Sequence, residues 1–301
     1  MKTHLVISGG ACYGISMLGI LNYLYLENKL NSIKYIASNS IGSFFSLVYC
    51  LNVPLELVEE IIREIIKKNL YSITNDNFSN LFIENGIFDT NNIMIKIKNY
   101  IETKYKIYDI TFIELSKRFG KNLYISTTQL KDSKNKIFSV DETPNISVFD
   151  AVAASMALPF IMKPIKIEDE YYIDGVLSNN FPINIFNNIN SELILSILFL
   201  IDEKDENIDY NNIDFITYSK HIFKIILDNN TKLTSEINYK NFQKKDILII
   251  NDLPIVSHMP YIYNDKKDNN SIDIYLNDND IDNLILEGFI KTSEHFKYIK
   301  S

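Results

Sequence analysis

The chain has 301 residues, of which 46% are hydrophobic, and it carries a formal net charge of -8. A chain of this length and composition can bury a large core. Its negative charge, and the lack of a zinc-ligand spacing, a Walker loop or a platform of interleaved basic and aromatic residues, argue against nucleic-acid binding.

The first fifty residues alternate between short apolar segments bounded by turn residues and longer apolar stretches of helical character. They predict, in order, a strand at His4–Ser8, a helix at Gly14–Leu26, a strand at Ile33–Ala37 and a helix at Ile41–Leu51. Such an opening favours a mostly parallel sheet covered by helices, with ligands at the carboxyl ends of the strands. We therefore predict a three-layer α/β/α fold with a mostly parallel central sheet.

Further elements follow along the rest of the chain. The pattern predicts helices at Leu55–Asn69, Asn91–Glu102, Val148–Ala157 and Asp280–Phe296, strands at Lys121–Ser126, Leu193–Leu200 and Ile247–Ile250, and a hairpin of Ile165–Ile167 with Tyr171–Ile173. Two stretches rich in Asn and Asp, 202–214 and 264–280, are predicted surface loops. No linker or repeat divides the chain, so we expect a single domain at 1–301, in which 4–185 carry the motifs and 186–301 complete the same unit.

The segment Ser8–Gly14, SGGACYG, joins the first predicted strand to the first predicted helix. Glycines there allow a sharp turn and leave N–H groups facing an anion beside a helix amino terminus. Gly9, Ala11 and Gly14 also approach a dinucleotide-binding pattern, but the second strand ends in the run 37–39, Ala-Ser-Asn, where that pattern needs an acidic residue. An anion-binding loop and a structural tight turn both stay open.

The stretch Ser38–Gly42, SNSIG, differs at one position from the nucleophile elbow G-x-S-x-G. An elbow needs small residues two positions before and after the serine, because its strained turn presses against neighbouring elements. The alternative is an ordinary strand-to-helix loop with a capping serine. The place of the motif, after a predicted strand and before an apolar helix, favours the elbow and makes Ser40 a candidate nucleophile.

The pair Asp174-Gly175 lies in a third motif, YIDGVLSNNFPI at 172–183, and an Asp-Gly pair taken alone is most often a turn. Together with SGGACYG, the stretch around Ser40 and AASMALPFIMKPI at 153–165, this motif resembles the patatin-like phospholipase family in identity and in order. The resemblance covers about residues 4–185, and LEGFIKTSEHF in the last predicted helix is compatible with the family's ending. As a set, the four motifs are specific.

The resemblance implies that Ser40 is the nucleophile and Asp174 its base. It implies that backbone N–H groups of the glycine-rich loop and of the residue after the serine form an oxyanion hole, from Gly9, Gly10, Ala11 and Ile41. It also implies that small residues beside these motifs support them, namely Gly14, Ser38, Gly42 and Gly175. A serine hydroxyl is a poor nucleophile unless a base takes its proton. Preorganised N–H donors stabilise the oxyanion by about 3 to 4 kcal/mol each. Burial would raise the pKa of an aspartate and so make it a stronger base. Three residues depart from the family pattern: Ser38 replaces glycine, Ala11 replaces the third loop glycine, and Tyr13 replaces a basic residue.

The resemblance implies a lipid acyl hydrolase of phospholipase A or lysophospholipase type, which cleaves fatty acyl esters through a Ser-Asp dyad and an acyl-enzyme. Its substrate would be a phospholipid or another acyl lipid, and we expect no cofactor and no metal. One alternative is an inactive relative that binds lipid or protein. Another is a Ser-His-Asp esterase of soluble esters, but each histidine after Asp174 (His221, His258, His295) is better explained as structural or exposed, and His4 comes too early in the chain.

The chain offers no segment for crossing a membrane: MKTHLVISGG reaches glycine too early for a secretory signal, and no apolar run is long enough. Cys12 and Cys50 lie in apolar surroundings, as expected in a reducing compartment. We therefore expect a cytoplasmic, intracellular protein, with any membrane contact peripheral. The sequence leaves the oligomeric state open.

The stretch Asn91–Lys136 is basic, with ten Lys and Arg against four Asp and Glu, so it carries +6 and the rest of the chain -14. One hypothesis is that this stretch meets a lipid surface through its charge while apolar side chains insert beside it, namely Ile101, Tyr105, Tyr108 and Phe112. The alternative is a solvated helix and loop whose apolar residues face the core.

Overall fold

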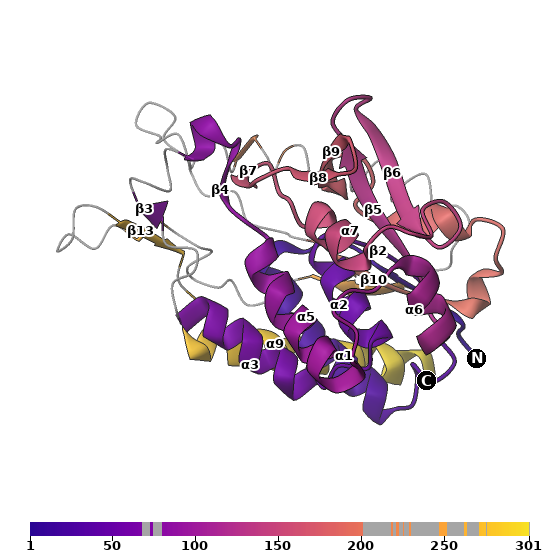
Figure 1. The fold of residues 1–301 in the computed structure, drawn as a ribbon. Helices are drawn as coiled ribbons and strands as arrows, with labels where there is room; N and C mark the ends of the chain where they lie inside the picture. The colour runs from indigo at the N-terminus through magenta and orange to yellow at the C-terminus, as the bar shows by residue number, and fades with distance from the viewer. Residues whose placement is uncertain are drawn as a thin grey trace.

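The protein is described by a computed structural model at residues 1–67, 73–74, 80–200, 218, 221–222, 225, 229, 247–251, 262–263, 271–274 and 276–300 (Figure 1). Its main sheet has eight strands in the order β11-β10-β1-β2-β5-β9-β8, with β6 paired to β5 beside this path. The strands are β1 (His4–Ile7), β2 (Tyr35–Asn39), β5 (Asn122–Gln129), β6 (Lys134–Ser139), β8 (Ile165–Ile167), β9 (Glu170–Asp174), β10 (Ile194–Phe199) and β11 (Ile247–Ile250).

The sheet is mostly parallel, as predicted. Strands β11, β10, β1, β2 and β5 run parallel to one another, whereas β6 and β9 pair antiparallel with β5, and β8 pairs antiparallel with β9. Parallel neighbours need long crossovers, which helices supply here between β1 and β2 and between β2 and β5. The helices are η1 (Ala11–Ser16), α1 (Met17–Leu26), α2 (Ile41–Cys50), α3 (Leu55–Lys67), α5 (Asn91–Tyr105), α6 (Phe112–Phe119), α7 (Val148–Ser155), η2 (Gly175–Leu177), η3 (Pro182–Phe186), η4 (Ser191–Leu193) and α9 (Asp278–Lys300).

Two small sheets lie apart from the main one. Strand β4 (Gly86–Phe88) pairs with β7 (Phe160–Met162), and β13 (Ser271–Ile274) pairs with both β12 (Ile262–Tyr263) and β3 (Ile73–Thr74). Since β7 follows α7 closely, the β4–β7 ribbon extends from the part of the chain that leads to β8 and β9 (Figure 1).

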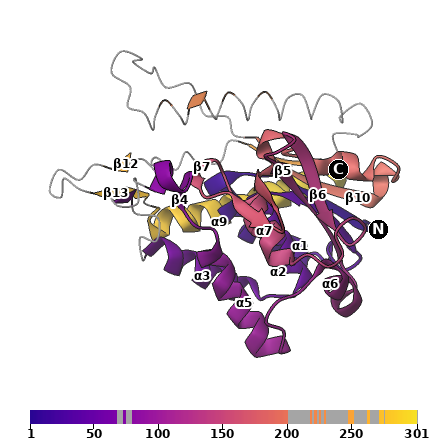
Figure 2. The same cartoon turned by 45° about the horizontal axis from the view of Figure 1, so that its top comes forward.

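The sheet has an apolar layer on each face because its strands alternate in side-chain direction. Leu5 and Ile7 belong to the larger core cluster, which the helices α1, α2, α5, α7 and α9 complete on one side, as Figures 1 and 2 show. Val6, between them, belongs to a second cluster with Phe181 and Ile183 of the η3 region. The α/β fold, with a central sheet flanked by helices, is therefore confirmed.

Helix α9 packs directly on the first helices of the chain. A Cβ added to Gly19 of α1 would lie 1.8 Å from the carbonyl oxygen of Ile285, and one added to Gly288 of α9 would lie 2.1 Å from that of Ser16. Real Cβ atoms do not approach other atoms this closely, so both positions need glycine. Through these contacts the end of the chain holds η1 and α1, which follow the glycine-rich loop.

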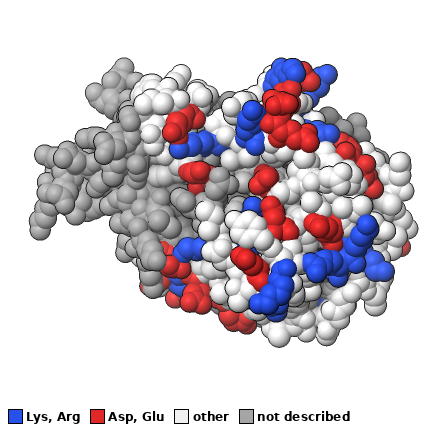
Figure 3. All heavy atoms as spheres, in the orientation of Figure 1, with Lys and Arg blue, Asp and Glu red and all other residues white. Residues whose placement is uncertain are grey.

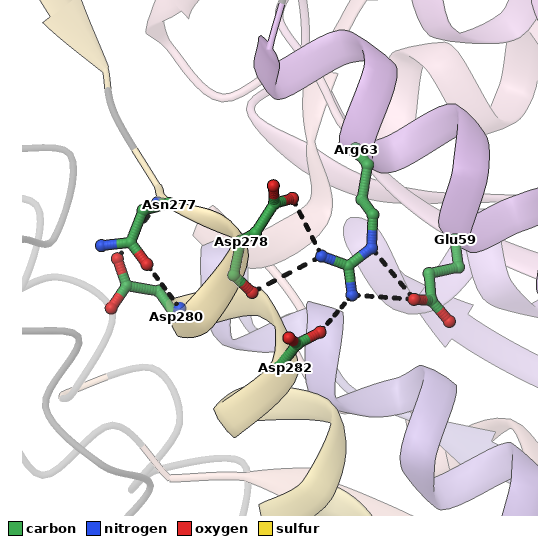
Figure 4. Close-up of polar contacts among 6 residues, drawn as sticks. All are labelled: Glu59, Arg63, Asn277, Asp278, Asp280 and Asp282. Atoms are coloured by element: carbon green, nitrogen blue, oxygen red, sulfur yellow. Dashed lines mark hydrogen bonds and ion pairs between the residues drawn. The ribbon is translucent and has the colours of Figure 1, made fainter.

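An arginine joins α3 to the start of α9 (Figure 4). The Arg63 guanidinium donates to Glu59 at 2.8 Å and 3.0 Å within α3, and to the Asp278 carboxylate at 3.1 Å. It also pairs with Asp282, one turn further along α9. Three carboxylates thus surround one cation whose side chain is only 19% exposed.

Replacing Arg63 by methionine is expected to lower the free energy of unfolding by about 1 kcal/mol, because the carboxylates lose their cation while the apolar stem is kept. Urea unfolding measures the change, and the loss should shrink in about 1 M salt. Arg118→Met, at an exposed site on α6, is the matched control. An equal loss in both variants, or one that salt leaves unchanged, would contradict the bridging role.

Several predicted boundaries shift. Strand β2 begins and ends two residues later than predicted, so it leads without a break into Ser40, and the predicted first helix is divided into η1 and α1. Helix α3 is described to Lys67, and the last two residues of its predicted range lie outside the described chain. The prediction of a loop at 264–280 is wrong in part, since β13 lies within it and α9 begins at Asp278, whereas the loop predicted at 202–214 lies outside the described residues.

Among the elements that the sequence did not predict are α6 and β6. Helix α6 had a detectable signal, a capping box in which Thr111 accepts from the Glu114 N–H and the Glu114 carboxylate accepts from the Thr111 N–H. Strand β6 is exposed at its first two residues and buried at its last two, so its side chains lack the alternation that predicts a half-buried strand.

Candidate active site

The predicted site residues come from three strands whose ends meet at one edge of the sheet. The loop Ser8–Gly10 follows β1, and Ser40 follows β2, where Asn39 is paired with Ser126 of β5. Asp174 ends β9, which runs antiparallel to β5, and is paired with Thr127. The parallel strands β1 and β2 end at the same edge of the sheet, and the last residue of the antiparallel β9 lies beside that edge. Ser40 and Asp174, more than a hundred residues apart in the chain, therefore lie close together there.

Ser40 has the strained backbone of an elbow. Its φ of 51° lies in the left-handed region, with ψ at -131°, a conformation that costs a residue with a side chain about 1 to 3 kcal/mol. It precedes α2, but its side chain makes no capping hydrogen bond to that helix. The alternative of an ordinary loop with a capping serine is therefore wrong.

A second serine holds the elbow in place. The N–H of Ser40 donates to the hydroxyl of Ser155 at 2.8 Å, and this hydroxyl donates in turn to the Ser126 carbonyl oxygen at 2.7 Å. Ser155 ends α7 and lies within the motif AASMALPFIMKPI, but the sequence assigned no role to this serine. The strained turn is thus tied both to α7 and to β5.

The glycines around the elbow are needed for space. A Cβ on Gly42 would lie 2.6 Å from the Ser8 carbonyl oxygen, and one on Gly14 would lie 2.5 Å from the Ile41 side chain. Gly175 is equally confined, because its Cβ would lie 2.3 Å from Oδ1 of Asn39. The turn, the glycine-rich loop and the Asp-Gly segment therefore lie in direct contact.

Asp174 accepts a short hydrogen bond from the Ser40 hydroxyl, with 2.6 Å between Oγ and Oδ2. Its other oxygen, Oδ1, accepts from the Val176 N–H at 2.9 Å and from the Asn39 amide at 3.2 Å. The residue is only 1% exposed. Desolvation raises the pKa of Asp174 to about 6, and the hydrogen bonds from Ser40, Val176 and Asn39 oppose this rise.

The loop residues differ in what their N–H groups contact. The N–H of Gly9 donates to the Asn180 side chain at 3.1 Å, so the expectation that Gly9 contributes a donor to the oxyanion hole is corrected. Gly10 caps η1 without a side-chain hydrogen bond at that terminus. Among the described residues, the N–H groups of Gly10, Ala11 and Ile41 donate to no acceptor outside the adjoining helices.

Of the three departures from the family pattern, Tyr13 fits the fold, whereas Ala11 and Ser38 each carry a local cost. Tyr13 is buried in the larger core cluster, where a basic residue would be desolvated. Ala11 has a φ of 46°, the left-handed region that glycine adopts without cost. Ser38 is fully buried in β2, and within the described part of the chain its hydroxyl has no hydrogen-bond partner.

Ser38→Ala is expected to raise the free energy of unfolding by about 1 kcal/mol, because a buried hydroxyl without a partner is desolvated without compensation. The free energies of unfolding of the wild type and of Ser38→Ala are compared by denaturant unfolding. Ser155→Ala supplies the contrast, since its hydroxyl has partners and its removal should destabilise. A loss of stability on Ser38→Ala would mean that the hydroxyl has an unrecognised acceptor.

None of the histidines that the structure describes hydrogen bonds to the Asp174 carboxylate. The side chains and N–H groups that hydrogen bond to the Asp174 carboxylate belong to Ser40, Asn39 and Val176. His4 is stacked on Tyr35 at the other end of the strands, and His295 contacts Phe296 in α9. His258 lies outside the described residues. Of the described residues, no cluster of His, Cys, Asp or Glu has the arrangement of a metal site.

The part of the basic stretch around Lys121 lies away from Ser40, whereas Lys136 of β6 pairs with Thr127, which also pairs with Asp174. Lys121 directly precedes β5, whose first residue pairs with the start of β2, so it lies at the opposite edge of the sheet. Its ammonium donates to the Ile33 carbonyl oxygen and to the Tyr49 hydroxyl, each at 2.5 Å, and is not free to meet a lipid surface. Figure 3 shows basic side chains gathered over α6 but acidic ones interspersed on the same face.

The apolar residues of this stretch mostly face inward. Ile101 and Phe112 are buried and Tyr105 packs against Phe119, which leaves Tyr108, 67% exposed, as the one that could insert in lipid. The hypothesis of an inserting surface is therefore wrong for three of its four residues, and the alternative of a solvated face over the core describes them. No helix in the described ranges has the length and apolar character needed to cross a membrane.

The fold and the site define an α/β protein in which a strand-to-helix elbow presents a serine to a buried aspartate beside a glycine-rich loop. The chain belongs to the patatin-like phospholipase family, whose model matches residues 5–187. The match spans the four motifs that carried the resemblance, and LEGFIKTSEHF in α9 lies outside it.

Two viral proteins are similar to this chain over alignments longer than the family match. Protein R571 of Acanthamoeba polyphaga mimivirus is 27% identical over 252 residues, 83% of each chain. Probable lipid hydrolase 463L of Invertebrate iridescent virus 6 is 30% identical over 227 residues, 70% of this chain and 76% of that protein. The crystal structure of VipD from Legionella pneumophila matches 99% of this chain and 67% of its own with a TM-score of 0.55 at 15% identity, which shows a shared fold.

Proposed function

We propose that this protein is a lipid acyl hydrolase of phospholipase A or lysophospholipase type, with Ser40 as nucleophile and Asp174 as base. The observation that carries the proposal is the 2.6 Å hydrogen bond between the Ser40 hydroxyl and the buried Asp174 carboxylate. Membership of the patatin-like phospholipase family and the likeness to a probable lipid hydrolase support a lipid ester as substrate.

In the first half of the reaction, Ser40 Oγ attacks the ester carbonyl carbon while its proton passes to Asp174 Oδ2. The carbonyl π electrons move to the oxygen, and the resulting oxyanion is stabilised by the N–H groups of Gly10, Ala11 and Ile41. When the intermediate collapses, its C–O bond to the lipid alcohol breaks, and the leaving oxygen takes the proton from Asp174. The fatty acyl group stays on Ser40.

In the second half, Asp174 accepts a proton from water, which attacks the acyl carbon. The bond to Ser40 Oγ breaks, Oγ regains a proton from Asp174, and the fatty acid leaves. The pKa of about 6 suits this role, because the carboxylate is ionised near neutral pH and yet is a stronger base than an exposed aspartate. No step requires a metal or a cofactor.

The two alternatives are weaker on specific grounds. A Ser-His-Asp esterase needs a histidine between serine and acid, whereas here these two residues contact each other directly. An inactive relative would have no reason to retain a strained Ser40 and a desolvated Asp174, both of which lower stability.

One experiment tests the proposal. The purified chain is incubated with a panel of labelled phospholipids, lysolipids and neutral glycerides, and released fatty acid is measured for the wild type and Ser40→Ala. Release by the wild type alone supports the proposal, and the preferred lipid identifies the head group and acyl position. No release from any lipid, by a folded wild type that a fluorophosphonate also fails to label, would favour the inactive relative.

A further inference from the structure

We propose that Asn39 and Asn180 are positioning residues whose side-chain amides form a hydrogen-bonded bridge between the Asp174 carboxylate and the backbone of the glycine-rich loop. This inference rests on the proposed function, since it assigns a task to residues beside the dyad. Neither asparagine was singled out in the sequence, although both lie inside the motifs quoted there.

The bridge consists of three hydrogen bonds. Nδ2 of Asn39 donates to Oδ1 of Asp174 at 3.2 Å and to Oδ1 of Asn180 at 3.1 Å. The same Oδ1 of Asn180 accepts the Gly9 N–H at 3.1 Å. Asn39 ends β2, Asn180 lies between η2 and η3, and both are at most 6% exposed. The bridge therefore connects the segments of the base, the nucleophile and the loop.

The chemistry of the partners fixes the direction of both amides. A backbone N–H can only donate, so the Asn180 atom that faces Gly9 is the oxygen. That oxygen can only accept, so the Asn39 atom that faces it is the NH2 group, which also faces the carboxylate. The Ser155 hydroxyl lies 3.4 Å from Asn39 Oδ1, but its one proton is directed at the Ser126 carbonyl oxygen at 2.7 Å, so this longer contact does not bear on the assignment. Each of the three hydrogen bonds of the bridge pairs a donor with an acceptor.

The bridge acts first on Asp174. Two donors, Asn39 and the Val176 N–H, hold Oδ1, so the carboxylate cannot rotate and Oδ2 stays directed at the Ser40 hydroxyl. The Asn39 donor also favours the ionised form, which is the form that accepts the serine proton. The surrounding groups are Ser40 and Asn39 near β2, Val176 in η2, Thr128 of β5 and the Ala157 carbonyl after α7, and none carries a charge.

The bridge acts second on the loop. Asn180 holds Gly9 by its side chain and, more weakly, by its own carbonyl oxygen at 3.3 Å. A Cβ on Gly9 would lie 2.5 Å from Oδ1 of Asn180 and 3.1 Å from the Cβ of Ser40, so the loop is held close against both. Fixing Gly9 fixes the direction of the N–H groups that follow it, those of Gly10 and Ala11.

The two asparagines should therefore affect catalysis differently. Asn39→Ala removes a donor from the carboxylate, so the midpoint of the acidic limb of kcat/KM should move up by about one pH unit. Asn39→Asp keeps the volume but sets a second carboxyl against Asp174, and the shift should be larger. Asn180→Ala should leave this midpoint in place and lower kcat about tenfold at nearly constant KM, because the loop donors act in the transition state.

Asn179→Ala is the matched control. Asn179 is as buried as its neighbour, but its amide donates to Asn184 and contacts neither the carboxylate nor Gly9. Rates are measured with p-nitrophenyl butyrate, a soluble ester, over a range of pH, and circular dichroism verifies the fold. The control should keep the pH midpoint and kcat of the wild type.

Two further measurements decide the matter without turnover. Carboxyl carbon NMR of 13C-labelled aspartate, assigned with Asp174→Asn, should show a higher pKa of Asp174 in Asn39→Ala, and hydrogen exchange at the Gly9 amide should be faster in Asn180→Ala. A wild type without hydrolysis would overturn the proposed function while these readouts still test the bridge. An unchanged titration in folded Asn39→Ala, or unchanged Gly9 exchange in folded Asn180→Ala, would overturn the bridge itself.

Discussion

Ser40→Ala is expected to lower hydrolysis of lipid and of p-nitrophenyl butyrate by at least about a thousandfold, because Ser40 is the residue whose hydroxyl is bonded to Asp174 and would form the acyl-enzyme. The remaining rate would come from direct attack of water on the ester, with the oxyanion stabilised by the N–H donors. The variant should fold, since alanine is smaller and the elbow is also held by the Ser40 N–H on Ser155.

A fluorophosphonate should label the wild type at Ser40, located by peptide mass spectrometry, and should not label Ser40→Ala. Ser43→Ala is the control, because Ser43 is also a buried serine of this region and its hydroxyl contacts Ser155 rather than Asp174. If Ser40→Ala retained the wild-type rate, or if label appeared on another serine, the nucleophile would have to be sought elsewhere.

Asp174→Asn is expected to cause a loss of similar size, again at least about a thousandfold, because the amide cannot accept the serine proton. The amide oxygen can take the place of Oδ1 and accept from Val176 and Asn39, and its NH2 group can donate to the Ser40 hydroxyl. The variant should therefore fold and bind substrate with KM little changed. A folded variant with substantial activity would rule out Asp174 as base.

The pH dependence follows from the raised pKa. In the wild type, kcat/KM should rise with pH through about 6, where Asp174 becomes ionised. For stability the sign is opposite: the folded state binds this proton more tightly than the unfolded chain, whose aspartates titrate near 3.8. The wild type should thus lose stability relative to Asp174→Asn as pH rises from about 4 to 6, and urea unfolding of both proteins over this range measures the difference.

Much of the site was predictable from the sequence. Motifs of glycine and other small residues can be recognised from a short stretch of sequence. A tight turn excludes larger side chains at positions such as Gly14 and Gly42, whatever the sequence of the rest of the chain. The apolar segments of β1, β10 and β11 were recognisable for a similar reason, because strands buried on both faces contain almost only apolar residues. Composition and pattern therefore indicated the class of fold and the place of Ser40.

Only the tertiary structure decided how the motifs act together. Three contacts depend on strand order and register. Asp174 contacts Ser40, the Gly9 N–H is held by Asn180 and is not a free donor, and the Lys121 ammonium is bonded at the opposite edge of the sheet. These contacts join residues far apart in the chain, and a pattern of neighbours carries no information about which distant atoms meet. The sequence by itself determined which residues are small, apolar or titratable; the packing of β1, β2, β5 and β9 determined their partners, and with them the pKa of Asp174, because desolvation depends on everything that surrounds a group in space.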